Sequence, residues 1–357
     1  MAADGRQRDA QVEEKYLNVT GKKVSFILIL PPLILLTLGI ATSLGSADIT
    51  MGEAYTALLH KFFPDYFRSN WLAETCVWDL RLPRILMGVL AGAGLGISGG
   101  VIQGVLRNPL ASPYTLGISS GAGFGASLAI LAGAGLGGGQ YLVIGNAFAF
   151  SLISAFIIIG LASQKGATPE TMILAGIAMT CLFSSATTVL QYFGEADAVK
   201  EAVFWMVGDL GRMSWNKLFM VFMALVICLP LLLFKAWDLN IMGAGDETAE
   251  SLGVSVKRTR LEMMVVSALL VASIVCFTGT IGFIGLVAPH IVRMVIGGDN
   301  RFLLPASGLV GAIMLLVADT VARRIVAPVI LPVGTLTAFL GVPLFLYLIM
   351  KKRREYF

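Results

Sequence analysis

The sequence has little charge. Asp, Glu, Lys and Arg make up only 13% of its 357 residues, whereas soluble proteins average about a quarter. This composition excludes an ordinary soluble globular domain. The formal net charge of +4 is modest. Basic residues in this number fit the Lys and Arg bias that orients a membrane protein better than they fit a nucleic-acid-binding surface. No nucleic-acid partner is therefore expected.

Motifs for nucleotide and metal chemistry are also missing. The one Gly-Lys pair, Gly21–Lys22, lacks the upstream Gly of a Walker A motif and is followed by Lys23 instead of Ser or Thr. The two histidines, His60 and His290, are far apart, and no HExxH occurs. We therefore expect no ATP hydrolysis, catalytic residue, metal site or cofactor in this chain.

Cysteine is scarce, and the cysteine spacing matches no common redox or metal-binding motif. The four cysteines form no CxxC motif, and three of them lie within apolar runs. A cysteine in such a run usually behaves as a small buried hydrophobe. We therefore expect small buried hydrophobes at all four positions, Cys76, Cys181, Cys228 and Cys276.

Long apolar runs dominate the chain. Hydrophobic residues make up 57% of it, and a spanning helix needs about 20 apolar residues. We predict an all-α polytopic membrane protein of about ten transmembrane helices. Glycines inside the runs, as in Ala91–Gly100, let the helices pack closely as one bundle. The predicted spans are residues 24–44, 82–106, 114–133, 140–162, 170–193, 214–234, 259–278, 281–296, 302–322 and 334–350.

The segments outside these runs suggest the organisation and the orientation. Residues 1–23 are predicted to be a polar cytoplasmic tail, followed by a transmembrane domain over residues 24–357. The first span is interpreted as retained, although Ser43–Asp48 leaves signal cleavage open. Two amphipathic stretches, 49–67 and 198–211, are expected at the surface. Most Lys and Arg residues fall in alternate loops, which places both termini in the cytoplasm.

One internal stretch, GAGDETAESLGVSVKRTR (Gly243–Arg260), is far more polar than its surroundings. Acids at the start and Gly253 after Leu252 predict a short helix with defined ends. The orientation places it in the cytoplasm. Ala249 and Leu252 are three residues apart, so they are expected on one face that could enter a groove of a partner. A solvated connector helix fits the same residues equally well.

Charged residues at the predicted outer face have two interpretations each. Arg81 and Arg84 open the second span, and Arg323 closes the ninth. They could anchor helix ends to lipid headgroups or pair with an acidic partner. Asp319 lies four residues before Arg323, which fits either a helical ion pair or a proton or ion relay.

Two further patterns are open to more than one interpretation. Met179 and Phe183 in the fifth span could line an apolar pathway or pack in the core. The stretches Ser98–Pro109 and Thr278–Pro289 share a Gly-spaced pattern that ends in Pro, and they adjoin spans of opposite direction. The shared pattern indicates either two inverted halves or a coincidence.

Long motifs in this sequence resemble the permease subunits of ABC importers for iron-siderophores, haem and cobalamin. They begin with RLPRILMGVLAGAGLGISGGVIQGVLRNPLASPYTLGISSGAG (Arg81–Gly123) and GDETAESLGVSVKRTR (Gly245–Arg260). GTIGFIGLVAPHIVRMVIGGDNRFLLPAS (Gly279–Ser307), ADTVAR (Ala318–Arg323) and LPVGTLTAFLGVPLFLYLI (Leu331–Ile349) follow in the same order. The resemblance covers the chain from about residue 24 onward.

The resemblance implies an assembly. Permeases of this family have ten spans and form homodimers with the substrate path at the interface. Each binds one cytoplasmic ATPase subunit, and a substrate-binding protein docks on the outer face. By this resemblance, residues 236–258 form the loop of coupling helices that seats in the ATPase. The coupling residues that it implies are Asp246, Glu247, Ala249, Leu252 and Gly253.

The resemblance also implies two further sites. Arg81, Arg84 and Arg323 match positions that pair with acids of the binding protein, contacts that govern encounter and orientation. Thr168–Glu170 aligns with a loop near the cytoplasmic gate. It reads Thr168, Pro169, Glu170 here, where small hydroxyl residues also occur in the family.

We therefore expect a permease that moves an iron(III)-siderophore-type chelate across the cytoplasmic membrane by alternating access, driven by ATP hydrolysis in the partner subunits. Cobalamin and haem are the alternatives within the family. Two functions of other classes stay open. An ion-coupled secondary transporter would depend on Asp319 and need no ATPase, and a membrane scaffold would transport nothing.

Overall fold

The computed structural model describes residues 2–45, 49–136, 138–139, 141–164 and 166–351, and the regular elements within these ranges are all helices. The fold is all-α and polytopic, as predicted. Each predicted span matches an apolar helix, and within the described residues seven are long enough to cross a membrane by length and composition. The helices are α1 (Ala2–Ser43), α4 (Leu82–Val105), α5 (Ile118–Ala132), α6 (Tyr141–Gln164), α7 (Pro169–Phe193), α9 (Trp215–Phe234), α12 (Val256–Thr278), α13 (Ile284–Ile296), α14 (Asn300–Ala322) and α15 (Val333–Lys351).

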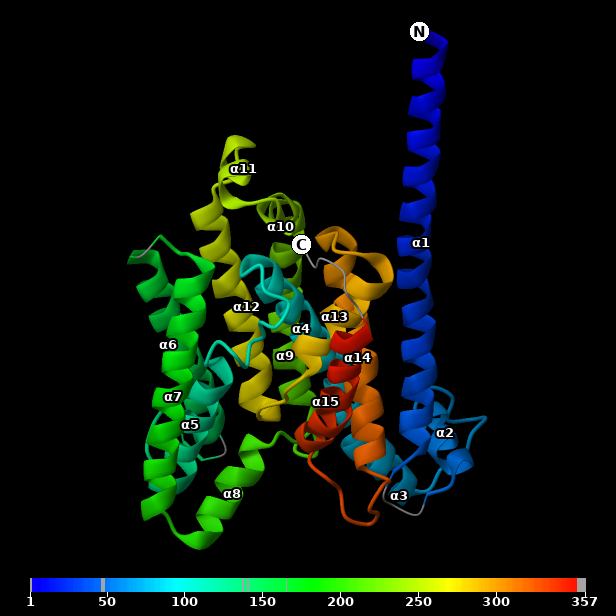
Figure 1. The fold of residues 1–357 in the computed structure, drawn as a ribbon. Helices are drawn as coiled ribbons and strands as arrows, with labels where there is room; N and C mark the ends of the chain where they lie inside the picture. Colours follow the sequence, from blue (N-terminus) through cyan, green and yellow to red (C-terminus); the bar gives the residue numbers. More distant parts are fainter. Residues whose placement is uncertain (1, 46–48, 137, 140, 165, 352–357) are drawn as a thin grey trace.

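Six short helical segments connect the long helices at the two ends of the bundle. In Figure 1, α10 and α11 lie at the end toward which the N-terminal part of α1 points, and α2, α3 and α8 lie at the opposite end. The amphipathic stretches 49–67 and 198–211 contain α2 and most of α8, respectively. The bounds are α2 (Met51–His60), α3 (Trp71–Glu74), η1 (Thr75–Arg81), α8 (Ala196–Met206), α10 (Ala236–Gly243) and α11 (Asp246–Ser251).

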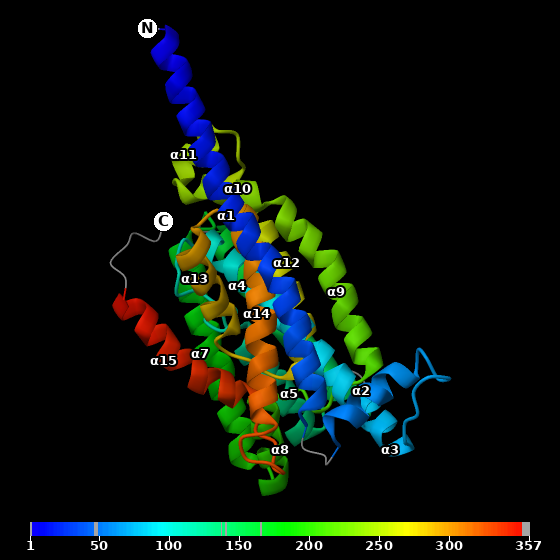
Figure 2. The ribbon, with the colours of Figure 1, turned by 90° about the vertical axis from the view of Figure 1, so that its right-hand side faces the viewer.

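The first helix is longer than its apolar run. Residues 2–23, predicted as a polar tail, continue the same helix as the apolar part of α1. In Figure 2, α1 runs beside α14. Helix-forming residues such as Glu13, Glu14 and Lys15 allow this continuation, and residues 2–23 contain no Pro that would break the helix.

The centre of the bundle is α4, whose residues are almost all buried. It packs against α12, α13 and α14. A Cβ atom added at Gly96 would overlap the backbone carbonyl of Ser307 on α14, and one at Gly99 would overlap that of Gly285 on α13. Lipid supplies no hydrophobic force between helices, so close approach at small residues holds the bundle together.

Gly99 and Gly285 lie in the two stretches that share the Gly-spaced pattern, Ser98–Pro109 and Thr278–Pro289. The two stretches therefore contact each other in the centre of the bundle. The inverted-repeat interpretation stays a prediction.

A second group of helices, α5, α6 and α7, packs beside the centre through α12 (Figure 1). The rings of Phe124, Phe150 and Phe183 meet among these three helices, with centroids 5.0 to 6.2 Å apart. Aromatic rings at this spacing add to the packing between helices.

Candidate functional site

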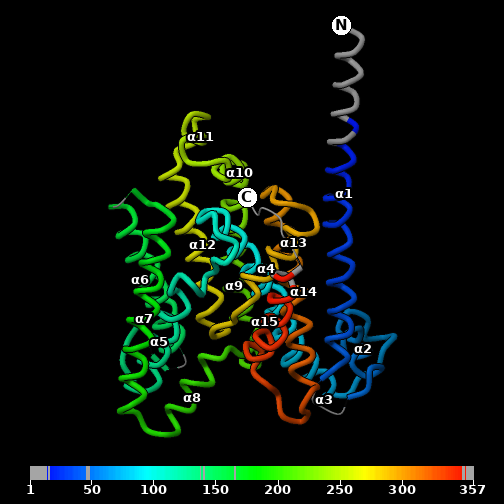
Figure 3. Tube along the Cα trace, viewed as in Figure 1, coloured from blue at the N-terminus to red at the C-terminus, as the bar shows by residue number. Residues whose placement is uncertain are grey.

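The segment predicted as a coupling loop contains two short helices that stand outside the bundle. The Cα trace in Figure 3 shows α10 and α11 beyond the N-terminal end of α12. Asp246 and Glu247 lie in the first turn of α11, and Gly253 follows the helix with a φ of +87°. A left-handed residue after a helix end favours glycine. The predicted helix boundaries are confirmed.

The two apolar residues of this segment lie on different surfaces. Ala249 is fully buried against Met242 and Val256, whereas Leu252 is 65% exposed. The expectation that both residues share one partner-facing surface was wrong. Leu252 caps the C-terminal end of α11, and the apolar cluster that buries Ala249 does not extend to it.

Asp246 joins α11 to the rest of the chain. Its carboxylate oxygens accept hydrogen bonds from Arg260 Nη2 at 3.0 and 3.2 Å, and Arg107 Nη2 lies 3.1 Å from Oδ1. Arg260 Nη1 donates to the carbonyl oxygen of Ala167 at 2.8 Å. Sequence reasoning missed the role of Arg260, because it reads as one of several bases in a cytoplasmic loop.

The predicted gate residues form the start of α7. Thr168 precedes the helix, and its Oγ1 accepts a hydrogen bond from the backbone N–H of Thr171 at 3.3 Å. Pro169 is the first helical residue, and Glu170 is exposed in the first turn. Threonine before a helix, proline at its first position and an acid in its first turn all favour helix initiation.

The other short helix, α10, is held by an amide–carboxylate cluster. Asn240 Nδ2 donates to Asp299 Oδ1 at 2.8 Å, and Asn240 Oδ1 accepts from the backbone N–H of Asn300 at 2.7 Å. Arg301 and Lys23 also contact Asp299, at 2.7 and 3.5 Å. Burial opposes ionisation of Asp299, but hydrogen bonds from Arg301 and Asn240 outweigh it and lower its pKa to about 2. The cluster joins α10 to the start of α14.

The three predicted docking arginines are buried at the opposite end of the bundle. Arg81, Arg84 and Arg323 are 5%, 7% and 3% exposed. Arg81 Nη1 donates to the carbonyl oxygen of Thr42 at 2.8 Å, and Arg323 Nη1 donates to that of Leu44 at 2.7 Å. These carbonyls end α1, where cations and hydrogen-bond donors are favourable.

A carboxylate between two of these arginines completes the outer cluster. Asp319 is fully buried, 2.7 Å from Arg84 Nη2 and 3.0 Å from Arg323 Nε. The helical pair expected for Asp319 and Arg323 is present, and a second arginine from α4 joins it. Their guanidinium groups are buried against this chain's own oxygens, and both the headgroup and the partner interpretation stay predictions.

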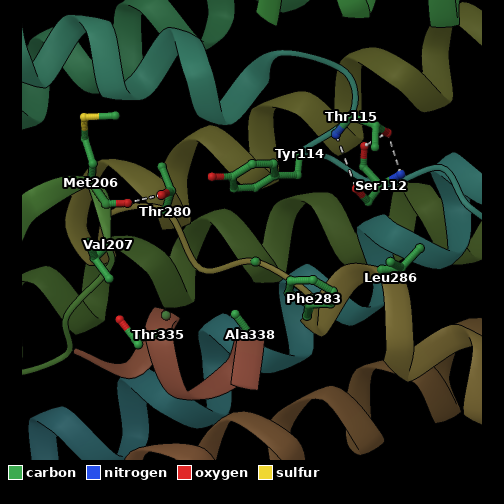
Figure 4. A pocket seen from close by; sticks show the side chains of 12 residues that line it. Ser112, Tyr114, Thr115, Met206, Val207, Thr280, Phe283, Leu286, Thr335 and Ala338 are labelled. Atoms are coloured by element: carbon green, nitrogen blue, oxygen red, sulfur yellow. Dashed lines mark hydrogen bonds between the residues drawn. The ribbon is translucent and has the colours of Figure 1, made fainter. Parts of the chain in front are cut away.

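An open pocket of about 450 Å³ lies between α15 and the loops before α5 and α13. Figure 4 shows the hydroxyl-bearing Tyr114 and Thr280 on one side of the pocket and Thr335 and Ala338 of α15 on another. Its lining carries no charged side chain. Such a surface suits a large ligand that is held by many weak contacts.

The two residues considered for an apolar pathway do not line this pocket. Met179 and Phe183 are both 6% exposed and belong to the packed interior of α5, α6 and α7. Their position favours the packing interpretation. α7 turns a different surface outward, which includes Cys181, Ser184, Ser185 and Thr188.

The cysteines are free thiols, and three of them are buried as expected. Cys181 is exposed instead, on the outward-facing surface of α7. Among the described residues, no group of three or more His, Cys, Asp and Glu side chains could hold a metal ion.

Comparisons with known proteins give one family. The FecCD transport family matches residues 33–351. A Methanocaldococcus jannaschii chain named as an ABC transporter permease protein is 44% identical over 95% of this chain and 98% of its own length. The hemin transport system permease protein of Yersinia pestis is 38% identical over 90% of this chain and 95% of its own length. The cobalamin import system permease protein of Halobacterium salinarum is 41% identical over 78% of this chain and 74% of its own length.

A solved structure named as a metal-chelate type ABC transporter in an inward-facing conformation has the same fold. It has a TM-score of 0.79 and 32% sequence identity, and the match covers 92% of this chain and 99% of that one. The matched family, the relatives and this fold agree over nearly the whole chain. The chain belongs to the FecCD transport family and is a multi-pass permease subunit of an ABC importer, not itself an ATPase and with no cofactor expected.

Proposed function

We propose that this permease carries an iron(III)-siderophore-type chelate across the cytoplasmic membrane by ATP-driven alternating access, with both termini in the cytoplasm. The observation that carries the mechanism is the pair of short helices α10 and α11, which stand outside the bundle and expose Leu252. A permease without its own nucleotide site needs such a surface, because an ATP-hydrolysing partner has to bind it and move it.

The coupling surface binds one cytoplasmic ATPase subunit per permease. Glu247 and Leu252 are exposed for this contact, whereas Ala249 supports them from below. An apolar side chain at the tip of a charged segment is the kind of anchor that fills a pocket in a partner protein. Closure of the ATPase subunits then moves α10 and α11, and the permease halves rotate against each other.

The permease works as a homodimer, and α7 faces the substrate path. The exposed surface of α7 has two sides. One side carries Cys181, Ser184, Ser185 and Thr188, and the other carries Leu182, Val189 and Phe193. Hydroxyl groups on a spanning helix are unfavourable against lipid and favourable beside water or a second protein.

A substrate-binding protein docks at the outer end, where Arg81, Arg84 and Arg323 are clustered. Because these side chains are buried, the cluster acts first through its excess positive charge, which attracts the acidic lobes of the binding protein. Direct pairing then requires Arg81 and Arg323 to exchange the carbonyl oxygens of Thr42 and Leu44 for carboxylates of the partner.

The neutral, hydroxyl-bearing pocket beside α15 supports passage of a bulky chelate without a tight site. The solved structure with 32% identity is named for a metal-chelate type transporter, which supports a metal chelate as the cargo. Cobalamin and haem are the alternatives, because relatives of 41% and 38% identity are named for cobalamin import and hemin transport.

An ion-coupled transporter would need Asp319 as a relay. Asp319 is held by two guanidinium groups at 2.7 and 3.0 Å, an arrangement that favours a structural ion pair, since a relay must release its proton. The ordered coupling helices argue against a scaffold that transports nothing.

The test is ATP hydrolysis by the permease and its ATPase in vesicles, with loaded binding proteins added outside. We expect stimulation by the iron-chelate-loaded protein, and loss of complex assembly with Leu252→Asp. Stimulation only by a cobalamin- or haem-loaded protein would overturn the substrate assignment and keep the mechanism. If the wild-type chain binds no ATPase, the coupling mechanism itself is wrong.

A further inference from the structure

We propose that Arg260 is a positioning residue that transmits movement of the coupling helix α11 to the start of α7. The inference rests on the proposed coupling to an ATPase and names the residue that carries the motion inward. α11 and α7 are joined through one side chain, because Arg260 contacts Asp246 and Ala167 at the same time.

The two contacts use different nitrogens of the guanidinium group. Nη2 donates to both carboxylate oxygens of Asp246, at 3.0 and 3.2 Å, and Nη1 donates to the carbonyl oxygen of Ala167 at 2.8 Å. The planar, fixed geometry of arginine makes this group a rigid strut. Asp246 opens α11, and Ala167 directly precedes Thr168, the residue that caps α7.

Burial keeps this strut in place. Arg260 is 1% exposed, and separating a buried charge from its partner is strongly unfavourable. A displacement of α11 therefore pulls Arg260 along with Asp246. The neighbouring Arg258 shows the contrast. Its side chain is 81% exposed and pairs with Glu262 at 2.7 Å on the same helix, a kind of pair that contributes little.

The backbone at the strut is unusual. Among the described residues, three that are not glycine have positive φ, and two of them, Ala167 at +56° and Arg107 at +46°, adjoin this cluster. Arg107 lies between α4 and α5 and contacts Asp246 at 3.1 Å. Residues held in the left-handed region are costly and gather where a segment switches. The strut therefore ends beside two backbone positions that are held in an unfavourable conformation.

The experiment uses the full complex of permease, ATPase and loaded binding protein in vesicles. Arg260→Lys keeps the charge and removes the planar fork, and Arg258→Lys is the matched control on the same helix. The first readout is the ratio of stimulated to basal ATP hydrolysis. The second is the ATP-dependent change in distance between spin labels at Glu250 on α11 and Glu170 on α7, after replacement of the exposed Cys181 by Ser.

We expect Arg260→Lys to lower the hydrolysis ratio by about fivefold or more and to abolish the change in label distance. Arg258→Lys should alter the ratio by less than about twofold. Asp246→Asn, a change at a partly exposed carboxylate, tests the same link if Arg260→Lys does not fold. Because the two residues share one contact, the loss in the double variant should be smaller than the sum of the losses in the single variants.

Two outcomes would overturn the inference. One is a normal ratio and a normal distance change in Arg260→Lys, and the other is additive losses in the double variant. Failure of the proposed function looks different, because the wild-type chain would then bind no ATPase or Leu252→Asp would assemble normally. Suppose that the wild type assembles with the ATPase, that Leu252→Asp does not, and that Arg260→Lys shows normal coupling. The proposed function then stands, and only this inference fails.

Discussion

Arg84 Nη2 lies 2.7 Å from the carboxylate of Asp319, a residue 235 positions later in the chain. The contact joins α4 to α14 at the outer end of the bundle, where both side chains are buried. Arg323 completes the pair from the other side at 3.0 Å. The charge that could have served a relay thus holds two central helices together.

The substitution Asp319→Asn should destabilise the protein by about 3–5 kcal/mol, because it leaves two buried guanidinium groups without their carboxylate. Thermal unfolding of the purified permease in detergent measures the loss. Asp209→Asn is the control, since that carboxylate is 30% exposed and 4.0 Å from Arg84. Equal unfolding temperatures for the two variants would contradict the assignment.

The substitution Gly96→Ala should separate α4 from α14. The added methyl group would overlap the backbone carbonyl of Ser307, which cannot rotate away as a side chain could. Overpacking of this kind costs about 1–3 kcal/mol, measured by the same unfolding experiment. The matched control is Gly160→Ala on α6, where no atom lies within 4 Å of the new methyl group. A larger loss from the control than from Gly96→Ala would refute the packing argument.

The attachment of α10 should be independent of pH over the physiological range. The pKa of Asp299 is lowered from 3.8 to about 2, so its ionised form stabilises the folded state fully above a pH of about 4. The stabilisation is lost as the pH falls from about 4 toward 2. Hydrogen exchange of the α10 amides, corrected for intrinsic rates, should give flat protection from about pH 5 to 8.

Asp299→Asn supplies the comparison, since it removes the charge that Arg301 and Lys23 contact. Its α10 amides should exchange faster than those of the wild type at pH 7. A marked rise in wild-type exchange between pH 7 and 5 would show that the carboxylate titrates there and that the lowered pKa is wrong.

Cys181 should react with a water-soluble maleimide in the assembled transporter if the hydroxyl side of α7 faces a water-filled path. It is the exposed cysteine of the four, and the others are buried. The control is a chain with Cys181→Ser and Leu182→Cys, which moves the thiol to the apolar side of the same helix. Faster labelling at position 182 than at 181 would place the path on the wrong side of α7.

Local sequence determined the parts of this protein that depend on neighbours in the chain. The ten apolar helices follow from apolar runs, and within the described residues seven of them are long enough to span a membrane with their backbone hydrogen bonds satisfied inside the helix. The ends of α11 follow from Asp246, Glu247 and Gly253, because acids stabilise a helix start and glycine accepts the left-handed residue after its end. The start of α7 follows from Thr168 and Pro169 in the same way.

Tertiary structure decided which side chains these helices expose and which they bury. Ala249 is buried because it packs against Met242 and Val256, and Leu252 is exposed because it lies outside that cluster. Phe183 packs and Cys181 is exposed because the two residues lie on different sides of α7. Arg260 reaches Ala167, 93 positions away, only when α12 stands beside the start of α7. The sequence alone therefore determined the helices and their ends, and the packing of distant segments decided what each charged or apolar residue contacts.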